Sequence, residues 1–266
     1  MITLKQITNF ELTKREKIIT SCILISLGLL STQLVPFYLT YRFIGGLTIF
    51  SLGLSLWALW EGISKTKAVI LMILPALFTL AVASYYFLLP VNWLTRLTVA
   101  SLFGLAFYTL LLSQNVFNVA SSRTIPLYRV ASTTIVVITL MTAYLLFNVL
   151  ASFNMIFFLN GVGVFLLAFP LILQVLWTIE MEGLTAIIIG YSFILALVAG
   201  EVGLALSFWP ISDAMFSLVL STVLYITLGI STHALRERLN KRLVWEYLGW
   251  GILIFLIALF TTSWTG

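Results

Sequence analysis

The feature that most constrains the fold is a run of about 50 consecutive uncharged residues, 130–179. A single helix of that length would extend about 75 Å, whereas the hydrocarbon core of a bilayer is about 30 Å thick. The run therefore predicts two membrane-spanning helices joined by a turn. Polar residues from Asn148 to Asn154 mark the expected place of that turn.

Composition extends this prediction to the whole chain. Hydrophobic residues make up 61% and charged residues 9%, and the mean hydropathy is +1.13. In hydrocarbon every backbone N–H and C=O must be bonded within the chain, which leaves helices or a closed barrel. The apolar runs are roughly 16 to 25 residues long without strict alternation, which favours helices over barrel strands of roughly 10 residues. We predict an all-α polytopic transmembrane helix bundle.

Charged residues and prolines divide the chain into about nine spans. Residues 1–17 are polar and basic, and the apolar run after them lacks a small-x-small cleavage site, so we interpret them as a cytoplasmic N-terminal segment before an uncleaved first span. A single transmembrane domain, 18–264, is predicted to hold spans near residues 18–35, 43–60, 68–89, 97–116, 130–150, 153–177, 184–208, 214–231 and 244–264.

Lysine and arginine set the predicted orientation, because positive charge in short loops is retained on the cytoplasmic side. With the N-terminus cytoplasmic and the C-terminus outside, 12 of the 14 basic residues fall inside and only Arg42 and Arg96 fall outside. This predicts a multi-pass protein of the cell (cytoplasmic) membrane. Topology also accounts for the net charge of +5, so we expect no nucleic-acid partner.

The most charged stretch is a predicted link, residues 232–243. Leu235, Leu239 and Leu243 recur every four residues, which places them on one face of a helix. The rest of the helix carries the basic residues Arg236, Arg238, Lys241 and Arg242. We predict a basic amphipathic segment on the cytoplasmic membrane surface that contacts anionic lipids. The alternative is a docking face for a membrane protein partner.

Glu201 is the single acid in the otherwise apolar seventh span, and it lies between Gly200 and Gly203. A carboxylate near the bilayer centre costs roughly 2.5–3.5 kcal/mol. Asn160 has a similar predicted depth in the sixth span, which should run antiparallel beside the seventh because the link between them is short. Flanking glycines would allow close approach. Our hypothesis is an Asn160–Glu201 hydrogen bond in the outer half of the bundle.

This pair has two interpretations. The first is structural: the pair is a polar clamp between two helices, or the carboxyl lies beside a water-filled crevice. The second is functional: the pair belongs to a polar pocket, since intramembrane acids often mark ion, proton or substrate pathways. The pocket would recruit polar residues in the outer halves of other spans, namely Tyr85, Tyr86, Tyr144 and Asn148. Its outer mouth would carry Arg42, Arg96 and Asp213. The two arginines would be able to neutralise a phosphate or carboxylate.

Catalytic motifs are missing from the sequence. It contains no H-E-x-x-H, G-x-S-x-G or Walker-type G-x-x-x-x-G-K-[ST] string. The single histidine, His233, and the single cysteine, Cys22, are expected at different depths, which argues against a Cys–His site. We therefore predict no metal and no cofactor, and we favour a non-enzymatic role.

Two function classes follow. The first is a non-enzymatic membrane subunit or scaffold of an envelope assembly, which the short loops favour because they leave no extramembrane domain for chemistry. The second is a small carrier or binder for a lipid or small solute, which would use the outer-leaflet polar pocket around Glu201.

Short stretches near the C-terminus carry a resemblance. They are Gly200-Glu201-Val202-Gly203 with Phe208-Trp209-Pro210, then Glu246-Tyr247-Leu248 and Thr262-Ser263-Trp264. In these stretches the C-terminal third resembles uncharacterised polytopic membrane proteins of candidate-phylum bacteria. The resemblance implies a bacterial cytoplasmic membrane and carries no activity with it.

Overall fold

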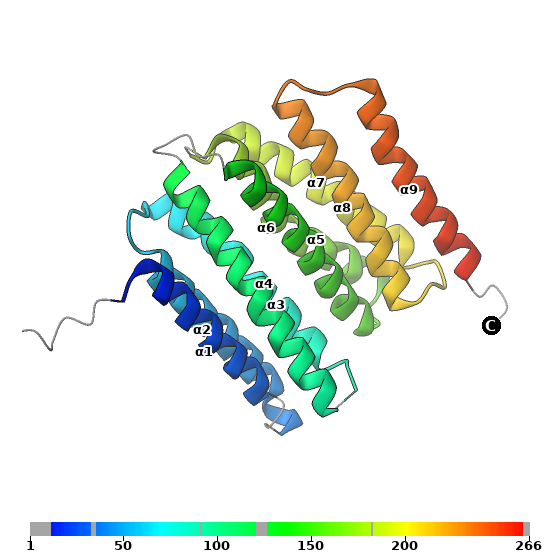
Figure 1. Ribbon diagram of the computed structural model, residues 1–266. Coiled ribbons are helices and arrows are strands. Elements are labelled where there is room, and N and C mark those ends of the chain that lie inside the picture. Colours follow the sequence, from blue (N-terminus) through cyan, green and yellow to red (C-terminus); the bar gives the residue numbers. More distant parts are fainter. Residues whose placement is uncertain (1–11, 33–35, 91, 121–126, 182, 263–266) are drawn as a thin grey trace, which may run out of the picture.

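The computed structural model describes residues 12–32, 36–90, 92–120, 127–181 and 183–262 (Figure 1). Several predicted features lie outside the described residues: most of the N-terminal segment (1–11), the end of the first span (33–35) and the end of the ninth (263–264). Arg123, in the link between the fourth and fifth spans, lies outside them too.

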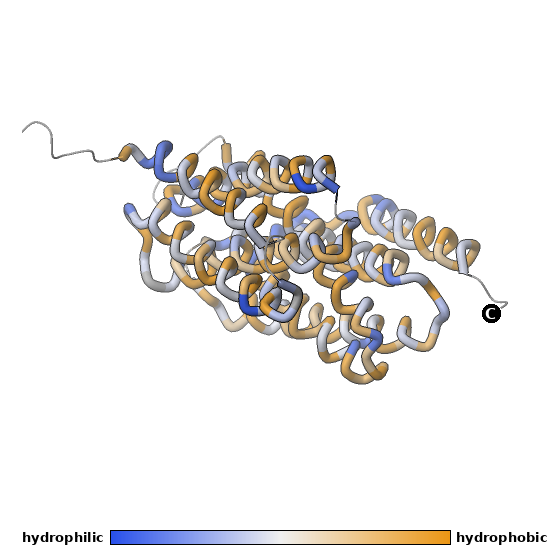
Figure 2. Tube along the Cα trace, turned by 90° about the horizontal axis from the view of Figure 1, so that it is seen from below, coloured by the Kyte–Doolittle hydropathy of each residue, from blue (hydrophilic) through white to orange (hydrophobic). Residues whose placement is uncertain are grey.

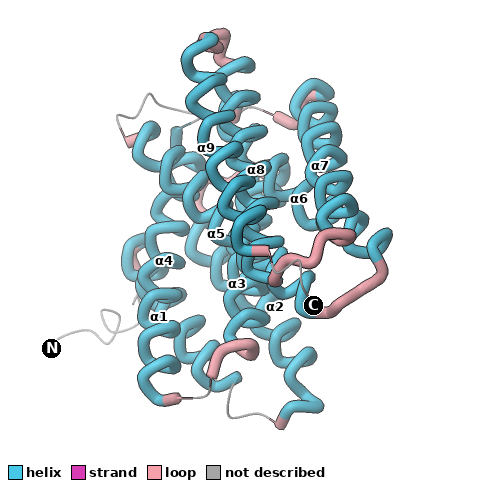
Figure 3. The backbone as a smooth tube through the Cα atoms, turned by 90° about the vertical axis from the view of Figure 1, so that its right-hand side faces the viewer, coloured by secondary structure: helices cyan, strands magenta, loops and turns pink. Residues whose placement is uncertain are grey.

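The described ranges contain nine long α-helices, one short 3₁₀ helix and no strand (Figure 3). In chain order they are α1 (Lys14–Thr32), η2 (Phe37–Leu39), α2 (Thr40–Leu59), α3 (Lys65–Tyr86), α4 (Trp93–Ala120), α5 (Tyr128–Ser152), α6 (Phe157–Glu180), α7 (Ala186–Leu206), α8 (Asp213–Leu235) and α9 (Lys241–Thr261). The predicted all-α polytopic bundle is confirmed.

Length and composition allow eight of the described helices, α2 to α9, to cross a membrane. Helix α1 has a comparable length, about 28 Å at 1.5 Å per residue, but its first turn holds Lys14, Arg15, Glu16 and Lys17. Figure 2 shows hydrophobic residues along the helix bodies and hydrophilic residues mostly towards their ends and links. The chain is a multi-pass membrane protein.

The helices form two layers (Figure 1). One layer contains α1, α4, α5, α8 and α9, each in contact with the next, and the other contains α2, α3, α6 and α7 in the same way. Helices α1 to α4 pack around one another in a ring of four, and α5 to α8 repeat the same pattern of neighbours. Helix α9 stands outside both rings and packs mainly on α8, so most of its surface is exposed.

The predicted break within the uncharged run is confirmed. Helix α5 ends at Ser152 and α6 begins at Phe157. Between them Asn154 adopts a left-handed conformation with φ 48°, which asparagine tolerates better than most residues. Helix α4 is longer than the predicted span 97–116, because it continues through the polar residues that follow the apolar run.

The predicted amphipathic helix over residues 232–243 is wrong. Helix α8 continues to Leu235, a short turn follows, and α9 begins at Lys241. Leu235 ends α8, Leu239 lies in the link and Leu243 lies in α9, so the three leucines do not share one helical face. Glu237 closes α8 in a left-handed conformation with φ 54°.

One end of the bundle collects most of the described basic residues, and we call it the basic end. There Lys17 Nζ of α1 lies 2.9 Å from Glu61 Oε1, in the turn after α2. Asn118 Nδ2 of α4 donates to the carbonyl oxygens of Leu59 and Glu61, both at 3.2 Å. The hydrogen bond and the positive charge of Lys17 lower the pKa of the Glu61 carboxyl. These contacts tie α1, α2 and α4 together at the basic end.

Candidate functional site

Glu201 lies on the outer wall of the bundle, on α7, and its side chain is exposed. It is five residues from the end of the helix at Leu206, or about 7.5 Å along the axis. Within the described residues its carboxylate has no hydrogen bond or ion pair. The acid therefore faces whatever surrounds the bundle.

The helices α6 and α7 form the closest pair in the bundle. A Cβ built on Gly161 would lie 3.1 Å from the Gly200 carbonyl oxygen, and one on Gly203 would lie 2.8 Å from the Val164 side chain. Only glycine permits such contact, so the predicted close antiparallel packing of these helices is confirmed. Gly163 does not take part in it, because it faces Leu150 of α5.

Asn160 does not meet Glu201. Its Nδ2 donates to Ser207 Oγ at 3.2 Å, and Ser207 Oγ in turn donates to the Gly203 carbonyl oxygen at 2.8 Å. The reason is helical geometry. Gly200, Gly203 and Ser207 share the face of α7 that packs on α6, whereas Glu201 is rotated from Gly200 by about 100°.

Glu201 is the only charged group in the lining of an open groove of about 330 Å³ between α6 and α7. Aromatic and aliphatic residues form the rest of the lining, which includes Phe158, Phe165, Phe193 and Leu197. The rings of Phe165 and Phe193 meet edge to face across the two helices, with centroids 5.4 Å apart. We call this the α6–α7 groove.

The other residues of the predicted pocket are elsewhere. Tyr86 of α3 and Asn148 of α5 are buried inside the bundle, and Tyr85 and Tyr144 are half-buried on the same two helices. None of them lines the α6–α7 groove. The structure therefore does not assemble these residues with Glu201 into one site.

The predicted outer mouth is also dispersed. Arg42 lines a cavity of about 280 Å³ between α1 and α2. The guanidinium of Arg96 lies over the Trp93 ring at 5.3 Å, in the first turn of α4, and Asp213 begins α8. Among the described residues no hydrogen bond or ion pair joins any two of these three side chains.

The predicted basic patch divides into two parts. Arg238, Lys241 and Arg242 are exposed at the basic end, and Arg242 Nε lies 3.2 Å from Glu246 Oε1. Arg236 is half-buried and points into the bundle. Its Nη2 donates to the Tyr128 hydroxyl at 2.9 Å, and that hydroxyl donates to the Thr178 carbonyl oxygen at 2.8 Å.

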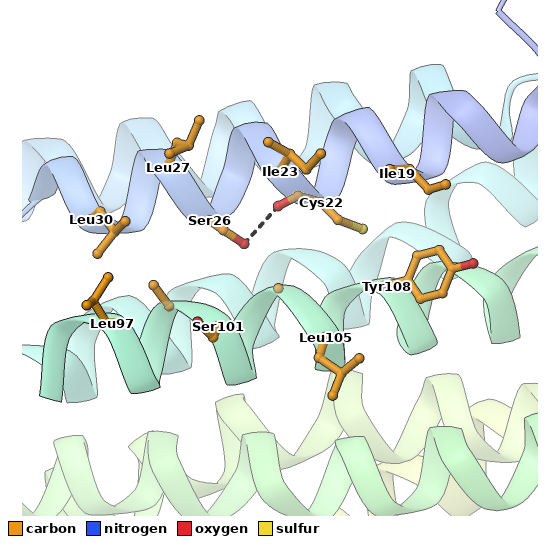
Figure 4. A pocket seen from close by; sticks show the side chains of 12 residues that line it. Ile19, Cys22, Ile23, Ser26, Leu27, Leu30, Leu97, Ser101, Leu105 and Tyr108 are labelled. Atoms are coloured by element: carbon orange, nitrogen blue, oxygen red, sulfur yellow. Dashed lines mark hydrogen bonds between the residues drawn. The ribbon is translucent and has the colours of Figure 1, made fainter. Parts of the chain in front are cut away.

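Two further cavities were not predicted. The larger, about 600 Å³, is mostly apolar and lies between α2, α3, α5 and α6, at the end opposite the basic end. The other, about 460 Å³, lies between α1 and α4 and contains the buried Cys22 beside Ser26, whose hydroxyl donates to the Cys22 carbonyl oxygen (Figure 4). Both linings contain glycine, which has no side chain to fill the space: Gly45 and Gly163 in the larger cavity and Gly104 in the smaller. These glycines are the weak signal for the cavities in the sequence.

Within the described ranges no three His, Cys, Asp or Glu side chains cluster as metal ligands would. A family model described as "Protein of unknown function (DUF5656)" matches residues 58–261, well over half of the chain. The chain belongs to the DUF5656 family. The DUF5656 match includes α3 to α9 in full, and therefore Glu201 and the α6–α7 groove. Comparisons with curated proteins and with solved structures found no match.

Proposed function

We propose that this DUF5656 protein is a non-enzymatic subunit or scaffold of a membrane-embedded envelope assembly. We place it in a bacterial cytoplasmic membrane with the basic end inside. A transmembrane helix of a membrane protein partner packs against the α6–α7 groove and offers a basic or hydrogen-bond-donating side chain to Glu201. The observation that supports this proposal is the exposed carboxylate of Glu201, which lies in an apolar groove and has no partner among the described residues.

The energetics favour a partner of this chemistry. An intramembrane carboxylate that faces lipid is costly, by roughly 2.5–3.5 kcal/mol near the bilayer centre and less towards the surface. Residues of this kind usually face a bundle interior and pair with another group. Since α7 directs Glu201 outwards, a second protein would restore that arrangement by covering the groove.

The groove also offers packing. Without a hydrophobic driving force between helices in lipid, association depends on close contact and interhelical hydrogen bonds. The groove around Glu201 is lined by the aromatic rings of Phe158, Phe165 and Phe193. Side chains of a partner helix would pack between these rings. The exposed Arg238, Lys241 and Arg242 then remain for anionic lipid at the cytoplasmic face.

The proposal is tested by photo-crosslinking in the native membrane. A photoreactive residue at Leu197, inside the groove, should capture a protein of defined mass, and the same residue at the exposed Phe260 of α9 should not. Glu201→Leu should abolish the adduct at Leu197 without loss of insertion. Glu180→Gln, which removes an exposed acid at the basic end of α6, should leave it unchanged.

Three outcomes would contradict the proposal. They are an unchanged adduct in an inserted Glu201→Leu protein, an adduct that contains only lipid, and an adduct between two copies of this chain. The last outcome would make the groove a self-association surface.

A second candidate function is supported by the apolar cavity of about 600 Å³ between α2, α3, α5 and α6. A carrier or binder for a lipid or apolar solute would hold its ligand there, away from Glu201. Native mass spectrometry of the extracted protein separates the two functions. A bound small molecule that is lost on Gly163→Leu and kept on Glu201→Leu would favour the carrier.

A further inference from the structure

A groove at the basic end, distinct from the α6–α7 groove, lies between α5, α8 and α9 and has a volume of about 210 Å³. Helix α8 forms its floor, because α8 contacts both α5 and α9. Its lining is Ser132, Thr133, Val136, Tyr225, Leu228, Gly229, Thr232, His233 and Tyr247. We call it the α5–α8–α9 groove. Nothing described above uses it.

The lining is unusually polar for this chain. Five of its nine residues carry a hydroxyl group, and the sixth polar residue is His233, the chain's single histidine. The hydroxyls of Ser132 and Thr232 have no hydrogen-bond partner among the described residues. The Tyr225 and Tyr247 rings meet at 5.0 Å between centroids, and Tyr247 lies 6.3 Å from the His233 ring. Hydrogen-bond donors therefore gather at one place.

The position of Tyr247 depends on Gly229. A Cβ at residue 229 would collide with the Tyr247 ring, so the glycine lets the ring lie directly on α8. This contact turns Tyr247 into a wall of the groove. Since α9 packs mainly on α8, the space between α9 and α5 is open to the side.

Positive charge surrounds the mouth. Arg129 precedes Ser132 and Thr133 by one turn of α5, is exposed, and has no ion pair among the described residues. Arg238, Lys241 and Arg242 lie on the neighbouring link and the start of α9. Two acids are near, but Glu246 is paired with Arg242, and Glu237 is exposed on the turn after α8. The rim therefore keeps an excess of positive charge.

The depth of the lining residues matches the headgroup region and the upper acyl region of a bilayer. Thr232 is three residues from the end of α8, about 4.5 Å, and Tyr247 is six residues into α9, about 9 Å. Val136 and Leu228 add apolar lining about one turn below Thr133 and Thr232, and Tyr225 lies about one turn below Leu228. An amphipathic ligand with an anionic head fits a groove that has a positively charged rim, hydroxyl groups near its mouth and apolar lining further in.

We propose that the α5–α8–α9 groove binds the phosphate headgroup of an anionic phospholipid from the leaflet at the basic end. Arg129 neutralises the phosphate, and the hydroxyls of Ser132 and Thr232 donate hydrogen bonds to its oxygens. The acyl chains leave through the open side between α5 and α9. A free phosphate ion would use the same donors but not the apolar lower lining.

The experiment is native mass spectrometry of the full chain in lipid-free detergent, titrated with phosphatidylglycerol. We expect one saturable lipid per chain. Phosphatidylcholine, which has the same phosphate but no net charge, should bind at least about ten-fold more weakly. Inorganic phosphate added in excess should not displace the lipid. Equal retention of both lipids, or displacement by phosphate alone, would overturn the proposal.

Matched variants locate the lipid. Arg129→Gln should weaken phosphatidylglycerol binding at least about ten-fold, whereas Arg15→Gln, which removes the same charge from the basic end at the start of α1, should change it less than about two-fold. Ser132→Leu, which fills the groove without changing charge, should also weaken binding. Equal effects of the two arginine variants would indicate diffuse surface attraction and overturn the site. Melting temperatures near that of the wild type identify the folded variants, and Arg129→Gln suffices if Ser132→Leu unfolds.

Discussion

Gly161 of α6 and Gly200 of α7 face each other so closely that a Cβ on Gly200 would lie 2.9 Å from the Gly161 carbonyl oxygen, and one on Gly161 would lie 3.1 Å from that of Gly200. The contact is reciprocal and involves backbone atoms, which cannot move aside as a flexible side chain can. It holds α6 and α7 together as one unit and thereby fixes the direction of Glu201.

Gly200→Leu should separate α6 from α7 and destabilise the folded protein by about 1–3 kcal/mol, the usual cost of overpacking. Thermal unfolding in mild detergent measures this effect. Gly190→Leu is the matched control on the same helix, because no atom lies within 4 Å of a Cβ at that position. Equal melting temperatures for the two variants would show that the glycine contact is not required.

A second contact, between Arg236 and Tyr128, connects α8 and α5, the last and first helices of the second four-helix unit. Tyr128→Phe removes the hydroxyl that accepts from Arg236 and donates to the Thr178 carbonyl oxygen. We expect a loss of about 1–3 kcal/mol, since the change leaves a charged donor and a carbonyl without their partner. Tyr41→Phe, at an exposed tyrosine, should have no effect on the melting temperature.

The number of helices and the hidden turn after Asn148 were predictable because hydrocarbon imposes them. Backbone groups must be bonded within each span, and a span cannot much exceed the thickness of the core. The break between α5 and α6 follows from length alone, even though no charge marks it.

The direction in which Glu201 points could not be predicted from hydropathy. Helix α7 is apolar around its whole circumference, so the pattern indicates the depth of the acid and not the side to which it points. The positions of Gly200 and Gly203 indicate that direction. Once Gly200 and Gly203 are assigned to the α6 contact, Glu201 must point about 100° away from it. The grooves were unpredictable for a related reason, since each depends on how several helices are placed.

The turn after α8 gives a prediction of a substitution that raises stability, whereas Gly200→Leu and Tyr128→Phe lower it. Glu237 adopts a left-handed conformation, which costs an L-residue roughly 1–2 kcal/mol relative to glycine. The amide nitrogens of Glu237 and Arg238 donate to the carbonyl oxygens of Ala234 and His233, the pattern of a Schellman motif that glycine normally completes. Glu237→Gly should therefore raise the melting temperature.

The control for this prediction is Glu246→Gly, which removes the same side chain from the interior of α9. It should lower stability by about 1 kcal/mol, because glycine is a poor helix former. A decrease for both variants would show that loss of the Glu237 charge outweighs relief of the backbone.

The Lys17–Glu61 ion pair gives a prediction for pH dependence. The pKa of the folded Glu61 carboxyl lies below its usual value of 4.5, because Lys17 donates a hydrogen bond to it and carries the opposite charge. A depressed folded pKa means that the pair contributes stability at pH values above the unfolded pKa. That contribution disappears as the pH falls through the lower folded pKa. Melting temperatures of the wild type and Glu61→Gln should therefore differ near neutral pH and converge in acid.

Because both side chains of the Lys17–Glu61 pair reach solvent, the difference in melting temperature should also shrink at high salt. The same comparison in a Lys17→Gln background should show no pH-dependent difference, and a difference that persists there would assign the effect to another group.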